Sequence, residues 1–162
     1  MERDKIDTFL ETLHGFPDMD YEVEGIVDRI HSLDHRFRRQ LAETLADHDL
    51  TSAEWGVLKS LYHRRQEDTC SPGDLSKELE LSSGAMTSRL DKLEQRGFIR
   101  RHPDPNDRRG VVLELTDAGE RAWMESTNAQ AKKEALLGGA LTKREQRELN
   151  ALLRKLMLAF DS

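Results

Sequence analysis

The segment from Leu81 to Thr116 contains the side chains whose types and spacing are best suited to recognising a ligand. It begins with a predicted helix that carries small polar and basic groups, and it continues into a predicted hairpin with basic residues at its turn. Such groups can donate hydrogen bonds to base edges and phosphates, which predicts a nucleic-acid contact. The residues expected to make this contact are Ser83, Thr87, Ser88, Arg89 and Lys92 in the helix and Asp107, Arg108 and Arg109 in the turn.

A predicted helix from about Ser83 positions the first group. Ser82 stands in the place of a capping hydroxyl, and Gly97 follows the last apolar turn, as expected at a helix end. Apolar residues recur at intervals of four and three, which places Met86, Leu90 and Leu93 on one side. The opposite side is expected to face outward. It comprises Gly84, Thr87, Ser88, Asp91, Lys92 and Gln95, with Arg89 and Arg96 at its edges.

A hairpin is predicted to carry the second group. Strands are expected over residues 98–102 and 111–115, separated by turn formers that include Pro103, Pro105 and Gly110. Neither proline can donate to a strand ladder, so the tip should be broad and exposed. It would present Arg108 and Arg109, with Asp107 close enough to orient one of them. A helix fits the major groove of DNA and an arginine on a thin loop fits the minor groove.

Other predicted helices surround this segment. Ser71, Pro72 and Asp74 form a helix start before the short helix 73–80, and its connection to the next helix indicates a helix-turn-helix. The further helices are expected over residues 21–47, from the Thr51–Glu54 capping box onward, 117–137 and 142–160. The alternative to a nucleic-acid contact is a solvated helix followed by an ordinary hairpin with arginines on its surface.

The hairpin also carries a family resemblance. Asp107, Arg109, Leu113, Leu115 and Thr116 fit the D-x-R-x-x-x-L-x-L-T wing pattern of the MarR family of bacterial transcription regulators, and SPGDLSKELELSSGAMTSRLDKLEQRG resembles its helix-turn-helix. The resemblance covers about Tyr21 to Phe160. It implies a homodimeric winged helix-turn-helix protein, often a repressor that a small aromatic ligand or oxidation releases from DNA. The expected fold is therefore mainly α with a small β-hairpin wing and terminal dimerisation helices.

The resemblance further implies a ligand cleft between the DNA-reading lobe and the dimerisation helices. Its expected lining is Phe37, Leu41, Trp55 and Leu58, which by periodicity alone are core residues. The urate-responsive branch is similar in having an extra N-terminal helix and a tryptophan. That branch has an aspartate where this chain has Gly56, so a small aromatic or anionic effector is expected without a named compound.

We expect one compact chain rather than independent domains: N-terminal helices (1–50), a winged lobe (51–116) and C-terminal helices (117–162). A lone winged lobe needs neither terminal apolar stripe, so both are expected to pack on a second copy. For the N-terminal stripe, docking on its own chain remains an alternative. The predicted dimerisation residues are Ile6, Phe9, Leu10, Leu149, Leu152, Leu153, Leu156 and Phe160.

Net charge is −6, which alone argues against a nucleic-acid partner. The distribution of the charge nevertheless favours a nucleic-acid partner, because residues 81–113 contain seven Lys or Arg and four Asp or Glu, a net charge of +3. The remainder has 18 basic and 27 acidic residues, a net −9. The sequence shows no membrane span and no secretory signal, so we expect a soluble, cytoplasmic chain.

Chemistry other than binding finds little support in the sequence. The single cysteine, Cys70, excludes an internal disulfide, and its redox role stays open. His31 and His35 lack a third ligand at useful spacing, so neither a metal nor a cofactor is expected. No nucleophile, phosphate loop or metal cluster indicates an enzyme. The remaining alternative is a dimeric protein-interaction module with a winged fold that does not read DNA.

Overall fold

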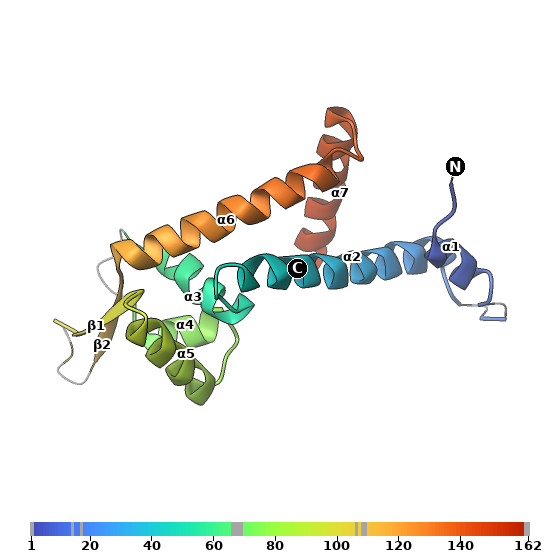
Figure 1. The fold of residues 1–162 in the computed structure, drawn as a ribbon. Coiled ribbons are helices and arrows are strands. Elements are labelled where there is room, and N and C mark those ends of the chain that lie inside the picture. Colours follow the sequence, from blue (N-terminus) through green and yellow to red (C-terminus); the bar gives the residue numbers. More distant parts are fainter. Residues whose placement is uncertain are drawn as a thin grey trace. The chain divides into compact units, whose positions relative to one another are not determined.

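The computed structural model describes residues 2–13, 15–16, 18–65, 70–105, 107 and 110–160, with the backbone alone at position 137. These residues form helices and one two-stranded antiparallel hairpin (Figure 1). The chain divides into two compact units, Met1–Glu43 and Thr44–Ser162. None of the described helices is both long and apolar enough to cross a lipid bilayer.

The first unit contains α1 (Lys5–Leu10) and most of α2 (Tyr21–Ala46). Asp4 caps α1, and its carboxylate also accepts from Arg29 Nε of α2 at 3.0 Å. Arg29 Nη2 donates to Asp7 Oδ1 at 2.5 Å. Near the Arg29–Asp7 ion pair Gly25 is buried, and a Cβ atom at Gly25 would lie 3.3 Å from Leu10 Cδ1. The N-terminal helix therefore docks on α2 of its own chain, which was one of the two alternatives for its apolar stripe.

The second unit builds its core around a helix-turn-helix. α3 (Ser52–His63) contacts α5 (Ser83–Gln95), and α4 (Pro72–Glu78) contacts α5 and β2 (Val111–Leu115). Where α3 contacts α6 (Asp117–Gly138), the Tyr62 and Trp123 rings stack with centroids 4.0 Å apart. Among the described residues of this unit, eight apolar side chains are less than 2% exposed. They are Leu45, Val57, Leu58, Leu75, Met86, Leu90, Leu93 and Ile99.

Local capping signals determine where the helices of the second unit begin. The predicted capping boxes of α3 and α4 are confirmed, with Thr51 paired to Glu54 and Ser71 to Asp74. The Ser71 hydroxyl and backbone N–H hold the pKa of the Asp74 carboxyl below its usual value. The predicted extension of α4 to Glu80 is wrong by two residues. Glu80 has φ +52° and Leu81 N donates to Ser76 O at 2.9 Å, a bond pattern that closes the helix.

The hairpin pairs β1 (Ile99–Pro103) with β2, from Ile99 opposite Leu115 to Pro103 opposite Val111. The predicted first strand, 98–102, is one residue out of place. Gly97 has φ +71° and Phe98 N donates to Leu93 O at 2.9 Å, so Phe98 still belongs to the end of α5. Along its other edge β2 is held by a bond from Leu113 N to Cys70 O at 2.8 Å.

The start of α6 lies tightly against the connection between α5 and β1. Thr116 Oγ1 donates to Gly97 O at 2.7 Å and accepts from Gly119 N at 3.1 Å, which confirms Thr116 as the cap of α6. Gly119 is buried, and a Cβ there would lie 2.1 Å from Phe98 O. Only glycine allows α6 to begin this close to the backbone of Phe98, the residue before β1.

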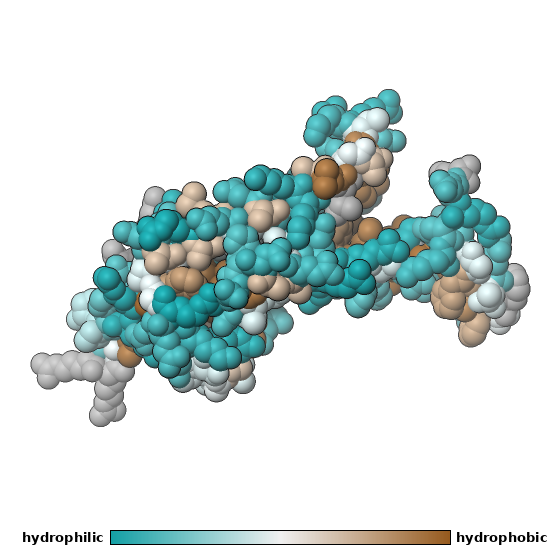
Figure 2. All heavy atoms as spheres, in the orientation of Figure 1, coloured by the Kyte–Doolittle hydropathy of each residue, from teal (hydrophilic) through white to brown (hydrophobic). Residues whose placement is uncertain are grey.

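Helix α7 (Lys143–Phe160) carries the apolar stripe that the sequence predicted, and none of its residues is buried. Leu152 is 61% exposed and Phe160 is 91% exposed. In Figure 2, brown and tan surface appears beside teal on α7. A helix with this much exposed hydrocarbon is typical of a protein interface.

Candidate nucleic-acid interface

Helix α5 separates its two faces as the sequence predicted. Met86 and Leu90 are 1% exposed and Leu93 is fully buried, so the apolar face is anchored in the core. The predicted outward positions are all exposed. They are Gly84, Thr87, Ser88, Asp91, Lys92 and Gln95. Because the buried face is fixed, the direction of the polar face relative to the helix-turn-helix is fixed as well.

The predicted DNA contacts on α5 fall into two groups. Thr87 Oγ1 donates to Ser83 O at 2.9 Å, and Arg89 Nη1 donates to Ala85 O at 2.8 Å, so both side chains are held against their own helix. Within the described part of the chain, the side chains of Ser83, Ser88 and Lys92 make no hydrogen bond or ion pair. These three polar groups remain available to a ligand.

Arg101 connects the hairpin to α5. Its Nη2 donates to Asp91 Oδ1 at 2.7 Å and its Nη1 donates to Glu94 Oε2 at 2.8 Å. The Arg101 side chain is only 28% exposed. Sequence reasoning missed this connection. A signal for this connection was available in the sequence. An arginine in the predicted strand follows a predicted helix in which two carboxylates, three residues apart, lie on adjacent turns of the helix surface.

The base of the hairpin tip is well ordered by hydrogen bonds. Asp104 N donates to Gly110 O at 3.0 Å, and Gly110 N donates to Asp107 O at 2.8 Å. A Cβ at Gly110 would lie 2.8 Å from Asp104 Cβ, so a side chain there would not fit. Asp107 is exposed. Arg108 and Arg109 lie outside the described residues, and their place at the tip stays a prediction.

A polar cluster fixes α4 against α3. Glu78 accepts from Ser60 Oγ at 2.7 Å and from Arg64 Nη2 at 2.8 Å. The Ser60 hydroxyl, followed by the Arg64 guanidinium, holds the pKa of the Glu78 carboxyl below its usual value, while partial burial opposes the shift. The first helix of the helix-turn-helix is thereby connected to the body that also carries α5.

The four residues of the predicted effector cleft are divided between the units. Phe37 (44% exposed) and Leu41 (half-buried) lie on α2 in the first unit. Leu58 is fully buried and Trp55 half-buried on α3 in the second. Trp55 Nε1 is buried and has no hydrogen-bond partner among the described residues. The structure does not bring the four together within one unit, so the cleft stays a prediction.

The predicted dimerisation residues are mostly exposed. Ile6 and Leu10 are half-buried on α1, where Phe9 is 49% exposed. The five on α7 range from 37% to 91% exposed, and they are Leu149, Leu152, Leu153, Leu156 and Phe160.

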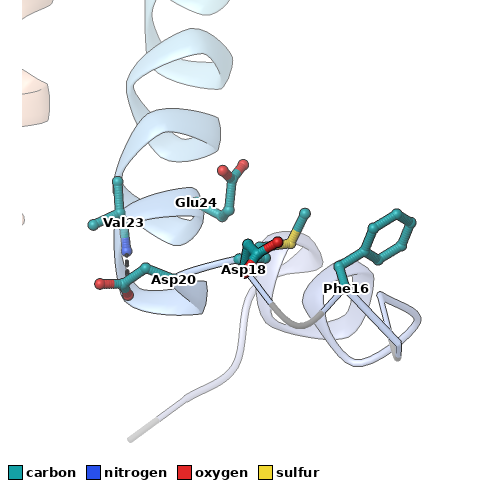
Figure 3. Close-up of a pocket in the computed structure, with 6 residues that line it drawn as sticks. Phe16, Asp18, Asp20, Val23 and Glu24 are labelled. Carbon is teal, nitrogen blue, oxygen red and sulfur yellow. Dashed lines mark hydrogen bonds between the residues drawn. The ribbon is translucent and has the colours of Figure 1, made fainter.

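Other candidate sites offer less chemistry. An open hollow of about 480 Å³ at the start of α2 is lined by Phe16, Asp18, Asp20 and Glu24 among others (Figure 3). Asp20 Oδ1 in it accepts from Val23 N at 3.2 Å, so this carboxylate serves as a helix cap. Among the described residues, no three His, Cys, Asp or Glu side chains are placed to hold a metal ion.

Cys70 is 5% exposed, as expected for a small apolar residue before a helix.

Comparison with known proteins agrees with this geometry. The model of the MarR family matches residues 50–111, from just before α3 to the first residue of β2. The chain is 29% identical over 137 residues to the transcriptional regulator PecS of Dickeya dadantii, covering 85% of this chain and 82% of PecS. It is 39% identical over 90 residues to the multiple antibiotic resistance protein MarR of Escherichia coli, covering 56% and 60%.

A solved structure extends the likeness over the remaining helices. A mutant MarR from Escherichia coli complexed with operator DNA is 32% identical, with a TM-score of 0.67, and the match covers 86% of this chain and 98% of that one. The likeness therefore includes the helix-turn-helix, the hairpin and helices on both sides. The chain belongs to the MarR family of transcription regulators.

Proposed function

We propose that this DNA-binding regulator acts as a homodimer on a pseudo-palindromic operator and represses transcription until a small effector releases it. In each subunit α5 enters the major groove with Ser83, Thr87, Ser88, Arg89 and Lys92 toward the DNA. The hairpin reaches the neighbouring minor groove with Arg108 and Arg109, beside Asp107.

The observation that carries the proposal is that ion pairs connect the exposed polar helix α5 to the β1–β2 hairpin. Arg101 holds β1 to α5 through Asp91 and Glu94, so the two contacting elements keep a fixed separation. Ser88 and Lys92 remain unpaired on the exposed side, within the described residues. A protein-binding surface would more often present aromatic or methionine anchors there than hydroxyl groups.

The distribution of charge along the chain also favours docking on DNA through α5 and the hairpin. Residues 81–113 have a net charge of +3, whereas the remaining chain has −9. Phosphates attract the first surface and are repelled by the rest, which favours one way of docking on a duplex.

The exposed stripe of α7 supports the homodimer. Leu152, Leu156 and Phe160 are 40% to 91% exposed, and a second copy that buries them gains roughly 25 cal/mol for each Å² of apolar surface. A twofold dimer presents two copies of α5 to the same face of DNA. Its half-sites should then lie about one helical turn, roughly 10 base pairs, apart.

An effector would act by linkage. We propose that a small aromatic or anionic compound contacts Phe37, Leu41, Trp55 and Leu58 and prefers a dimer whose α5 helices are wrongly spaced for the operator. The buried Trp55 Nε1, which lacks a partner among the described residues, supports a ligand with a hydrogen-bond acceptor. Titrating phenolic and purine compounds into an operator complex tests this, and no release by any of them leaves constitutive binding.

DNA contact by α5 is tested with selected duplexes and matched lysine variants. Lys92→Ala should weaken binding to every duplex and reduce the salt slope by about one unit, because one phosphate contact is lost. Lys132→Ala, which removes an exposed lysine of α6, should change neither quantity. Equal behaviour of the two variants would contradict the proposed orientation of α5.

The proposed partner, operator DNA, implies a cytoplasmic location. We assign the chain no catalytic step, and the relative PecS carries the name of a transcriptional regulator.

A further inference from the structure

We infer that Thr87 determines operator specificity by contacting the 5-methyl group of a thymine in the major groove. This inference rests on the proposed function, since it requires α5 to lie in that groove. It goes further in assigning a base and a chemical group to one side chain.

The hydroxyl group of Thr87 is already used within the helix. Its Oγ1 donates to Ser83 O at 2.9 Å, one turn earlier. The proton that could have been donated to a base acceptor is therefore committed, while the side chain as a whole is exposed. What Thr87 offers to a ligand is its methyl group, together with the remaining acceptor capacity of the oxygen.

Gly84 clears the approach to that methyl group. It lies three residues before Thr87 on the same exposed face. Apart from its chain neighbours and the backbone of α5, no described residue lies within 4 Å of the position that a Cβ would take there, and Gly84 does not have positive φ. The fold therefore does not require glycine, although glycine in a helix is less stable than alanine by about 0.5–1 kcal/mol. A close approach of DNA to the first turn of α5 accounts for it.

Two longer side chains near Thr87 on α5 are engaged by partners other than Thr87. Arg89 donates to Ala85 O at 2.8 Å, and Asp91 is held by Arg101 at 2.7 Å. Ser88 remains as a neighbouring hydroxyl without a partner among the described residues. The exposed surface at this level of the helix is thus a small apolar group beside a short polar one.

A methyl-to-methyl contact fits this surface. Thymine is the one DNA base that presents a methyl group in the major groove, and the methyl of threonine is among the groups that contact it. Removing one buried methyl group from such a contact should weaken binding about fourfold at each half-site.

The test compares thymine with deoxyuridine, which differs only by that methyl group. Duplexes bound by the full-length chain are first selected from random DNA. Each thymine of the selected site is then replaced singly by deoxyuridine, and affinities are measured for wild type, Thr87→Val and Thr87→Ser. Thermal unfolding of the variants is monitored to confirm that they fold.

Wild type should bind one substituted duplex about fourfold more weakly in each half-site. Thr87→Val, which keeps the methyl and loses the hydroxyl, should retain this discrimination, whereas Thr87→Ser should bind both duplexes equally. A selected site with no thymine–deoxyuridine difference, or loss of discrimination in Thr87→Val, would overturn the inference and leave the proposed function standing. Failure to select any duplex would instead remove the proposed function itself.

Discussion

Arg101 Nη2 in β1 lies 2.7 Å from Asp91 Oδ1 in α5, which makes the guanidinium the link between the hairpin and the outward helix. The same side chain reaches Glu94 at 2.8 Å, so it connects two points one turn apart on α5. A minor-groove contact from the hairpin and a major-groove contact from the helix can reinforce each other only if their separation is fixed.

Arg101→Ala should weaken binding to a selected duplex by about tenfold, or about 1.4 kcal/mol. The stability of the protein should fall by less than about 1 kcal/mol, because ion pairs this close to the surface contribute little. Fluorescence anisotropy and urea unfolding measure the two quantities. Arg144→Ala is a control of equal charge, since its pairing with Glu148 is confined to α7.

The double variant Asp91→Asn with Glu94→Gln separates positioning from charge. It makes this surface more positive, so a purely electrostatic role of the region predicts stronger binding to DNA. A positioning role predicts weaker binding, because the partners of Arg101 are no longer charged. Stronger binding by this variant would contradict the assignment of Arg101.

Gly84→Ala should have opposite effects on stability and binding. The protein should become more stable by up to about 1 kcal/mol, because alanine is the better helix residue and open space surrounds the site. Affinity for DNA should decrease, since the new methyl group intrudes on the closest part of the interface. A variant with improved stability and unchanged affinity would mean that α5 does not approach DNA at its first turn.

Gly119→Ala should destabilise the protein by about 1–3 kcal/mol. The added Cβ would meet Phe98 O at 2.1 Å, a backbone atom that cannot rotate away. Gly73→Ala is the matched control, because its Cβ would lie at an ordinary 3.6 Å from Ser71 Oγ. Equal urea midpoints for the two variants would contradict the close packing of α6 against the backbone of Phe98.

Acid should loosen the attachment of α4. The folded protein depresses the pKa of Glu78 below its usual 4.5, mainly through the Ser60 hydroxyl. The ionised carboxylate therefore stabilises the fold above pH 4.5, and this contribution is lost as pH falls through the lower folded pKa. Glu78→Gln should be less stable than wild type at neutral pH, with a smaller further loss on acidification.

Urea unfolding from pH 7 to pH 3 measures this dependence. Glu125→Gln is the control, because this carboxyl lies exposed on α6 and has no hydrogen bond or ion pair with the described residues. Parallel stability curves for wild type and Glu78→Gln would contradict the role assigned to Glu78.

Much of the architecture could be predicted because its signals are local. The pairs Thr51–Glu54 and Ser71–Asp74 each lie within four residues, and the buried face of α5 follows from the spacing of three leucine or methionine residues. The start of the hairpin was predicted one residue too early. Whether Phe98 belongs to the helix end or the strand depends on a hydrogen bond to Leu93, which residue preferences alone do not determine.

Contacts between distant residues could not be predicted. Arg101 pairs with carboxylates seven and ten positions earlier in the chain, and Arg29 of α2 holds Asp7 of α1 and its capping residue Asp4. Both depend on how two elements pack, which the helical repeat of either element does not contain. The N-terminal stripe illustrates the result, since the sequence favoured its packing on a second copy and left docking on its own chain as the alternative.

The number of chains bound to one selected duplex tests the central claim most directly. Sedimentation of the complex, combined with footprinting, should find two chains whose protected half-sites are related by a dyad and centred about 10 base pairs apart. A single chain protecting one asymmetric half-site would contradict the account.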